Sequence, residues 1–159
     1  MNGVDYIFEI AKLGAQLSGA AFVGWIAVRW ALARYKAEKI WDRRLSAYTE
    51  VISAFAQMQR VLAEWEDVAI THRDPSDDET SQLRQEYDVA EKSIRAVQGI
   101  AELLLPAEIS SILQTIERDL YRAAQGADTW FGSIDARWAV IEEAKTKIVK
   151  ISKSELGTA

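Results

Sequence analysis

The sequence predicts an all-α protein in which an N-terminal transmembrane helix continues into a cytosolic antiparallel four-helix bundle. Three observations predict this fold class. Residues 13–28 form the one long uncharged run, and apolar side chains recur at alternating steps of three and four in the remainder of the chain, which is the seam of a coiled coil or amphipathic helix. Only two of the 159 residues are proline, and no strand-type alternation or internal repeat is present.

The uncharged run 13–28 is flanked by Lys12 and Arg29. A membrane-spanning helix needs about 20 mostly apolar residues, so a span over about residues 10–32 requires the flanking cations to extend toward the interfaces. The apolar side chains cover nearly all sides of a helix, whereas a surface helix keeps a polar stripe. We therefore interpret residues 1–35 as a membrane anchor. The alternative is a soluble bundle with an unusually apolar first helix.

Basic residues follow the predicted span and form a collar. The collar consists of Arg29, Arg34, Lys36, Lys39, Arg43 and Arg44. Because cytoplasmic flanks of spans carry an excess of Lys and Arg, we expect the N-terminus outside and residues 36–159 in the cytoplasm. The collar is also suited to bind anionic lipid headgroups.

Small residues recur at four-residue steps in the anchor, in two rows. The rows are Ala11, Ala15 and Gly19, and Ala20 and Gly24. Such rows let helix backbones approach closely in lipid, and Gln16 is placed to hydrogen-bond across a helix–helix contact. We therefore expect self-association through this helix, although glycine and alanine are also common in spans that do not associate.

The bundle is predicted to contain helices over about residues 36–72, 79–105, 106–125 and 133–155. Nothing in the sequence breaks the chain between Trp25 and Thr71, so the anchor and the first bundle helix are expected to form one continuous helix or to bend at the membrane surface. Pro75 lies in a cluster of Asp, Ser and Thr that predicts the first loop. Pro106 predicts a corner, and Gly126 predicts the end of the third bundle helix.

No motif for catalysis or for metal binding is present. There is no cysteine, and the single histidine, His72, falls in a predicted loop. We therefore predict a protein that is not an enzyme, with no catalytic, cofactor-binding or metal-binding residues. The alternative is acid–base chemistry by an inward-facing carboxylate pair with raised pKa values. The candidates for such a pair are Glu64, Glu66, Glu142 and Glu143.

Two short runs, Lys39–Tyr48 and Leu104–Ile109, carry a resemblance. With the N-terminal apolar segment, they resemble small, mostly uncharacterised bacterial and prophage proteins that have one span and a helical cytosolic domain. The resemblance implies a single-pass protein of the bacterial inner membrane without catalytic residues. Some proteins of this build resemble membrane parts of phage-defence systems, so a membrane effector of phage defence is one implied role.

The expected function is that of a non-enzymatic, self-associating inner-membrane protein whose cytosolic helical domain mediates oligomerisation, partner binding or signalling. Its expected partners are membrane lipid, further copies of itself and a protein bound to the bundle. Nucleic acid is not expected, because acidic residues outnumber basic ones after the collar and the net charge is -5. The alternative is a soluble or peripheral helical adaptor whose apolar first helix docks on a partner chain.

Overall fold

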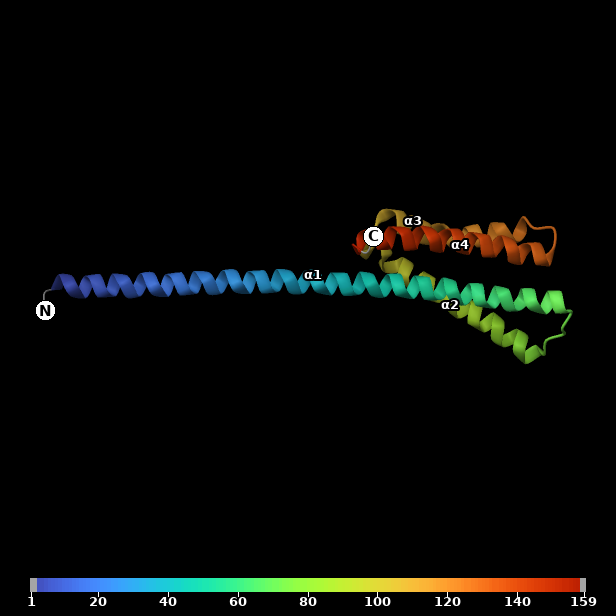
Figure 1. The fold of residues 1–159 in the computed structure, drawn as a ribbon, viewed down its shortest axis with the longest axis horizontal. Coiled ribbons are helices and arrows are strands. Elements are labelled where there is room, and N and C mark those ends of the chain that lie inside the picture. The colour runs from blue at the N-terminus through green and yellow to red at the C-terminus, as the bar shows by residue number, and fades with distance from the viewer. Residues whose placement is uncertain (1–2, 158–159) are drawn as a thin grey trace. The chain divides into compact units, whose positions relative to one another are not determined.

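The computed structural model describes the backbone of residues 3–157 and the side chains of residues 22–157. Four α-helices and no strand occur in this part of the chain, as the all-α prediction requires. The helices are α1 (Gly3–Thr71), α2 (Asp77–Leu104), α3 (Ala107–Gln125) and α4 (Trp130–Glu155) (Figure 1). The chain divides into an N-terminal unit, Met1–Asp42, and a bundle unit, Arg43–Ala159.

The first helix, α1, is one uninterrupted helix of 69 residues. It covers both the predicted anchor and the predicted first helix of the bundle. It ends at Thr71 because the next residue, His72, has a φ of 52°. This left-handed conformation stops the helical hydrogen-bond pattern, and Pro75 follows shortly afterwards.

Side-chain caps set the starts of α2 and α4. The backbone N–H of Glu79 donates to Ser76 Oγ at 3.2 Å, so α2 begins at Asp77 rather than near residue 79. The backbone N–H of Gly132 donates to Thr129 Oγ1 at 3.0 Å, so α4 begins at Trp130 rather than near residue 133. Each start precedes the predicted one, because the cap lies ahead of the first residue of the apolar pattern. Trp130 therefore belongs to the first turn of α4 and not to a connection between the helices predicted over residues 106–125 and 133–155.

The bundle unit is an antiparallel arrangement of the second part of α1 with α2, α3 and α4. Figure 1 shows the loop after α1 and the loop after α3 at the same end of this unit. Helix α3 packs against both α2 and α4. Helix α1 contacts α2 through the rings of Trp65 and Tyr87, whose centroids lie 5.6 Å apart, and contacts the end of α4 through the ion pair of Arg44 and Glu155, 3.8 Å.

One hydrophobic core joins the four helices. Its largest fully buried side chains are Phe55, Met58, Leu62, Ile94, Ile109, Leu113, Ile141, Ile148, Val51, Val61 and Val97. These residues recur at helical spacing on one side of each helix, so burying the four apolar stripes together removes them from water. The four-helix bundle of the prediction is therefore present.

Replacing Phe55 by alanine should destabilise the bundle strongly. The Phe55 side chain is fully buried, with an exposed fraction of 0%, and such a truncation costs about 3–5 kcal/mol of unfolding free energy. Urea denaturation followed by circular dichroism measures this change. Ser81→Ala on the exposed surface of α2 is the control. A loss below about 1 kcal/mol in Phe55→Ala would contradict the core assignment.

Candidate functional site

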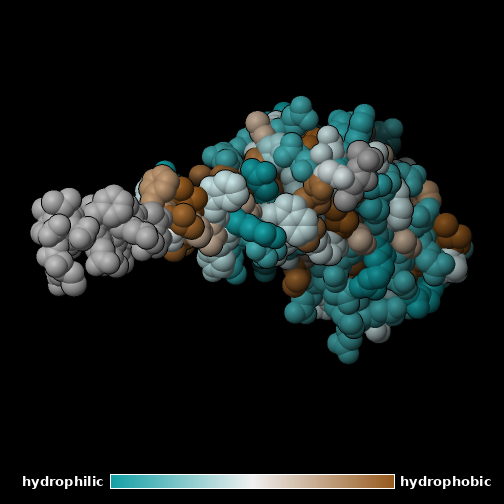
Figure 2. Space-filling model, turned by 60° about the vertical axis from the view of Figure 1, so that its left-hand side comes forward, coloured by the Kyte–Doolittle hydropathy of each residue, from teal (hydrophilic) through white to brown (hydrophobic). Residues whose placement is uncertain are grey.

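The described part of the N-terminal unit exposes large apolar side chains on every side of α1. They are Phe22, Val23, Trp25, Ile26, Val28, Trp30 and Leu32. Phe22 is 61% exposed and Trp30 is 77% exposed, and Figure 2 shows hydrophobic side chains gathered on this part of the helix. Consecutive residues of an α-helix point in different directions, so this segment has no polar stripe. A helix that is apolar all round is normally buried in a protein or in lipid.

None of the helices in the described part of the chain has the length and apolar character needed to cross a membrane. The predicted span, about residues 10–32, is covered only in part, because side chains are described from Phe22 onward. Of the predicted packing residues, Gly24 is described, and a Cβ added to it would meet nothing within 4 Å. The packing residues outside the described side chains are Ala11, Ala15, Gln16, Gly19 and Ala20.

Aromatic rings accompany two of the collar cations. The Arg29 guanidinium lies 5.3 Å from the centre of the Trp25 ring, and the Lys39 ammonium lies 5.9 Å from the centre of the Tyr35 ring. Both are cation–π geometries. At a membrane surface the ring of such a pair can lie in the apolar layer while the cation reaches the phosphates.

Two of the collar cations lie on a side of α1 that carries no acidic residue of this segment. Arg29 and Lys36 lie about two helical turns apart and therefore share one side. Glu38 and Asp42 lie about one turn apart and share another side. Arg29 and Lys36 therefore lie away from the acidic residues of this segment, whereas Arg34 precedes Glu38 by about one turn and shares its side.

Arg44 differs from the other collar residues, because it forms an ion pair with Glu155 at the end of α4. Beside this pair lies Tyr48, which is 2% exposed. Burial raises the pKa of the Tyr48 hydroxyl, the negative charge of Glu155 raises it further, and Arg44 lowers it. Arg44 therefore contributes to the packing of the bundle unit, a role that its position in the collar did not reveal.

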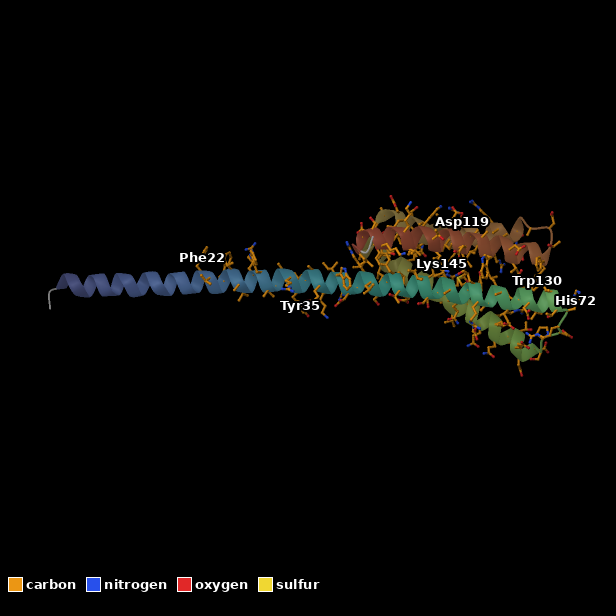
Figure 3. All side chains as sticks on the ribbon, in the orientation of Figure 1. Phe22, Tyr35, His72, Asp119, Trp130 and Lys145 are labelled. Atoms are coloured by element: carbon orange, nitrogen blue, oxygen red, sulfur yellow. The ribbon has the colours of Figure 1, made fainter. Side chains whose placement is uncertain are left out.

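A polar cluster joins α1 to α4 inside the bundle unit. Gln59, 6% exposed, donates a hydrogen bond from its amide to Glu142 Oε2 at 2.6 Å and accepts one from Lys145 Nζ at 2.9 Å. Lys145 lies beside α1 in Figure 3. The bond from Gln59, followed by the charge of Lys145, lowers the pKa of the Glu142 carboxyl. Sequence reasoning missed Gln59, whose only signal was an amide within an apolar stretch.

Three of the four candidate carboxylates, Glu64, Glu142 and Glu143, are engaged by basic or amide groups and not by one another. The pKa of Glu142 is lowered, whereas acid–base chemistry by a carboxylate pair needs a raised value. Glu64 forms an ion pair with Arg73, and Glu143 forms one with Lys147. No group of His, Asp and Glu side chains suited to hold a metal occurs among the described residues.

Comparisons with known proteins contribute no relative, since no family model, curated protein or solved structure matches this chain. The resemblance carried by residues 39–48 and 104–109 therefore stays a prediction. In the structure the first run lies within α1, and the second covers the end of α2, the corner at Pro106 and the start of α3.

Replacing Gln59 by methionine should raise the pKa of the Glu142 carboxyl, because the hydrogen bond to the ionised carboxylate is lost. A lowered pKa in the folded state stabilises the fold above the unfolded-state pKa, and this stabilisation disappears as the pH falls through the folded-state pKa. The difference in unfolding free energy between the native chain and Gln59→Met should therefore become smaller as the pH falls. NMR titration of Glu142 measures the pKa, with Ser154→Ala as the control. An unchanged titration would contradict the role of Gln59.

Proposed function

We propose that this chain is a single-pass inner-membrane protein whose N-terminus lies outside and whose helical bundle lies in the cytoplasm. One observation carries the proposal: the apolar surface of α1 over residues 22–32 is exposed on all sides and is followed directly by cationic residues. Keeping such a surface in water costs about 25 cal/mol per Å². Lipid would remove this cost over the whole circumference of the helix, which an ordinary one-sided protein contact would not.

The aromatic and basic residues after the apolar segment support the proposed orientation. Trp25, Trp30 and Tyr35 have the spacing of residues that lie at a membrane interface, and Arg29 and Lys39 lie against two of these rings. Each cation near an anionic surface contributes about 1 kcal/mol of binding free energy. The collar would therefore hold the start of the cytosolic domain against anionic headgroups.

The bundle would serve as the part that binds a partner or transmits a signal. Its surface carries large exposed apolar side chains that share one side of α2, among them Val89, Ile100 and Leu103, of which Leu103 is 84% exposed. Exposed apolar side chains of this size are typical of protein contact surfaces when they cluster. A role as membrane effector of phage defence is supported by the architectural resemblance alone.

The second candidate function is a soluble or peripheral adaptor whose apolar first helix docks on a partner chain. The same exposed residues 22–32 support it, since a groove on a larger protein could also cover them. The two functions differ in what covers the helix, so partitioning between membrane and solution separates them.

Carbonate extraction of cell membranes should leave the native chain in the pellet. The double variant Val23→Asp with Ile26→Asp should move to the supernatant, because each charge near the centre of a span costs about 2.5–3.5 kcal/mol. The matched control, Val89→Asp with Leu103→Asp, adds the same charges to the bundle surface and should stay in the pellet. Release of the native chain would reject the span and favour the adaptor.

Self-association should depend on the small-residue rows. Gly19→Leu or Gly24→Leu would place a bulky side chain between backbones that must approach closely. Each glycine belongs to a different row, so the oligomer should dissociate in the variant that changes the row at the helix–helix contact. Light scattering of the detergent-solubilised protein measures the mass. Gly99→Ala on α2, where an added Cβ meets nothing within 4 Å, is the control. An unchanged oligomer in both leucine variants would exclude association through these rows.

A further inference from the structure

A pocket of about 220 Å³ lies at the end of the bundle unit that holds the loop between α1 and α2. Its walls come from three helices and this loop: Trp65 from α1, Pro75 from the loop, Thr80 and Arg84 from α2, and Trp130 and Arg137 from α4. Figure 3 places Trp130 near His72 at this end of the bundle. Two tryptophans and two arginines, with the apolar Val68 and Leu83, therefore line one small cavity.

Neither guanidinium in the pocket has a carboxylate partner among the residues that the structure describes. Four acidic residues of α1 and α2 are paired with other arginines, and Asp88, one turn after Arg84 on α2, forms no ion pair with it. The pairs are Glu64 with Arg73, Glu79 with Arg73, Glu86 with Arg60, and Glu91 with Arg95. The positive charges of Arg84 and Arg137 are therefore not neutralised by an ion pair within the part of the chain that the structure describes.

Tyr87, which packs on Trp65, does not neutralise them either. Burial raises the pKa of the Tyr87 hydroxyl to about 12, with Arg137 acting in the opposite direction and Glu91 adding to the rise. The phenol is consequently uncharged at neutral pH. It packs against the Trp65 ring, and the charge of Arg137 stays available to a ligand.

We propose that this pocket binds a small organic anion that carries one aromatic ring and one phosphate or carboxylate group. The planar guanidinium groups of Arg84 and Arg137 match the oxygen atoms of either anion in a two-pronged geometry. The indoles of Trp65 and Trp130 offer flat apolar faces to a ring. The pocket is smaller than the roughly 300–1,000 Å³ of sites for drug-sized ligands, which restricts the ligand to about one ring with its charged group.

This site is independent of the proposed membrane function, because every residue in it belongs to the bundle unit. Failure of one proposal would not affect the other. Phosphate and carboxylate ligands share the required chemistry, so two probes, phenyl phosphate and phenylacetate, distinguish the two anions.

Isothermal titration of the full-length, detergent-solubilised protein tests the proposal. At least one of the two probes should bind saturably, and inorganic phosphate and phenol should bind at least tenfold more weakly, since each lacks half of the required chemistry. Arg84→Gln and Arg137→Gln should each weaken binding about tenfold or more, as expected for the loss of a charged hydrogen bond. Trp130→Ala should weaken it as well.

Arg122→Gln is the matched control, because Arg122 is an exposed arginine on α3 outside the pocket. Circular dichroism verifies that each variant keeps its helices, and Arg84→Lys and Arg137→Lys, which retain the charge, replace any glutamine variant that does not fold. If neither phenyl phosphate nor phenylacetate binds with a Kd below about 1 mM, the proposal is overturned. Equal binding of inorganic phosphate, or an equal loss of affinity in Arg122→Gln, would also overturn it.

Discussion

The apolar stripe of α1 is the feature on which the bundle depends. From Ala47 to Leu62 this stripe contributes a continuous set of buried side chains to the core, and α2 and α4 each contact α1 through additional polar or aromatic contacts. Most of the stability of a helix in a protein comes from packing its apolar face, not from helix propensity alone. The other three helices are short amphipathic segments that become stable by covering this stripe and one another.

The same helix carries a different surface over residues 22–32. In the bundle its apolar residues occupy one side, whereas here they occupy all sides and are exposed. A bundle can bury an apolar stripe that lies on one side of a helix. An apolar surface on all sides is buried only where the surroundings are apolar in every direction. This change of pattern along α1 is the observation behind the proposal that the two units lie in different surroundings.

Polar contacts link α1 to α4 within the bundle unit. Gln59 satisfies both halves of its amide by bonding to Glu142 and Lys145 on α4, and Arg44 bonds to Glu155 near the end of the same helix. A buried amide without partners would be costly, so these contacts disfavour a slip of α4 along α1. The arginines Arg84 and Arg137 are the contrast, because neither forms an ion pair with a described residue.

The sequence by itself determined the helical class, the number of bundle helices and their approximate limits, because apolar periodicity and the breaks at Pro75 and Pro106 act locally. It also located the basic collar, which is a matter of composition. Helix starts differed where a cap preceded the apolar pattern, as at Ser76 and Thr129. Only the tertiary structure brought Gln59 to Glu142 and Arg44 to Glu155, and gathered Trp65, Arg84 and Arg137 around one pocket. These groups are far apart in the chain, and their proximity follows from the alignment of four helices rather than from any local pattern.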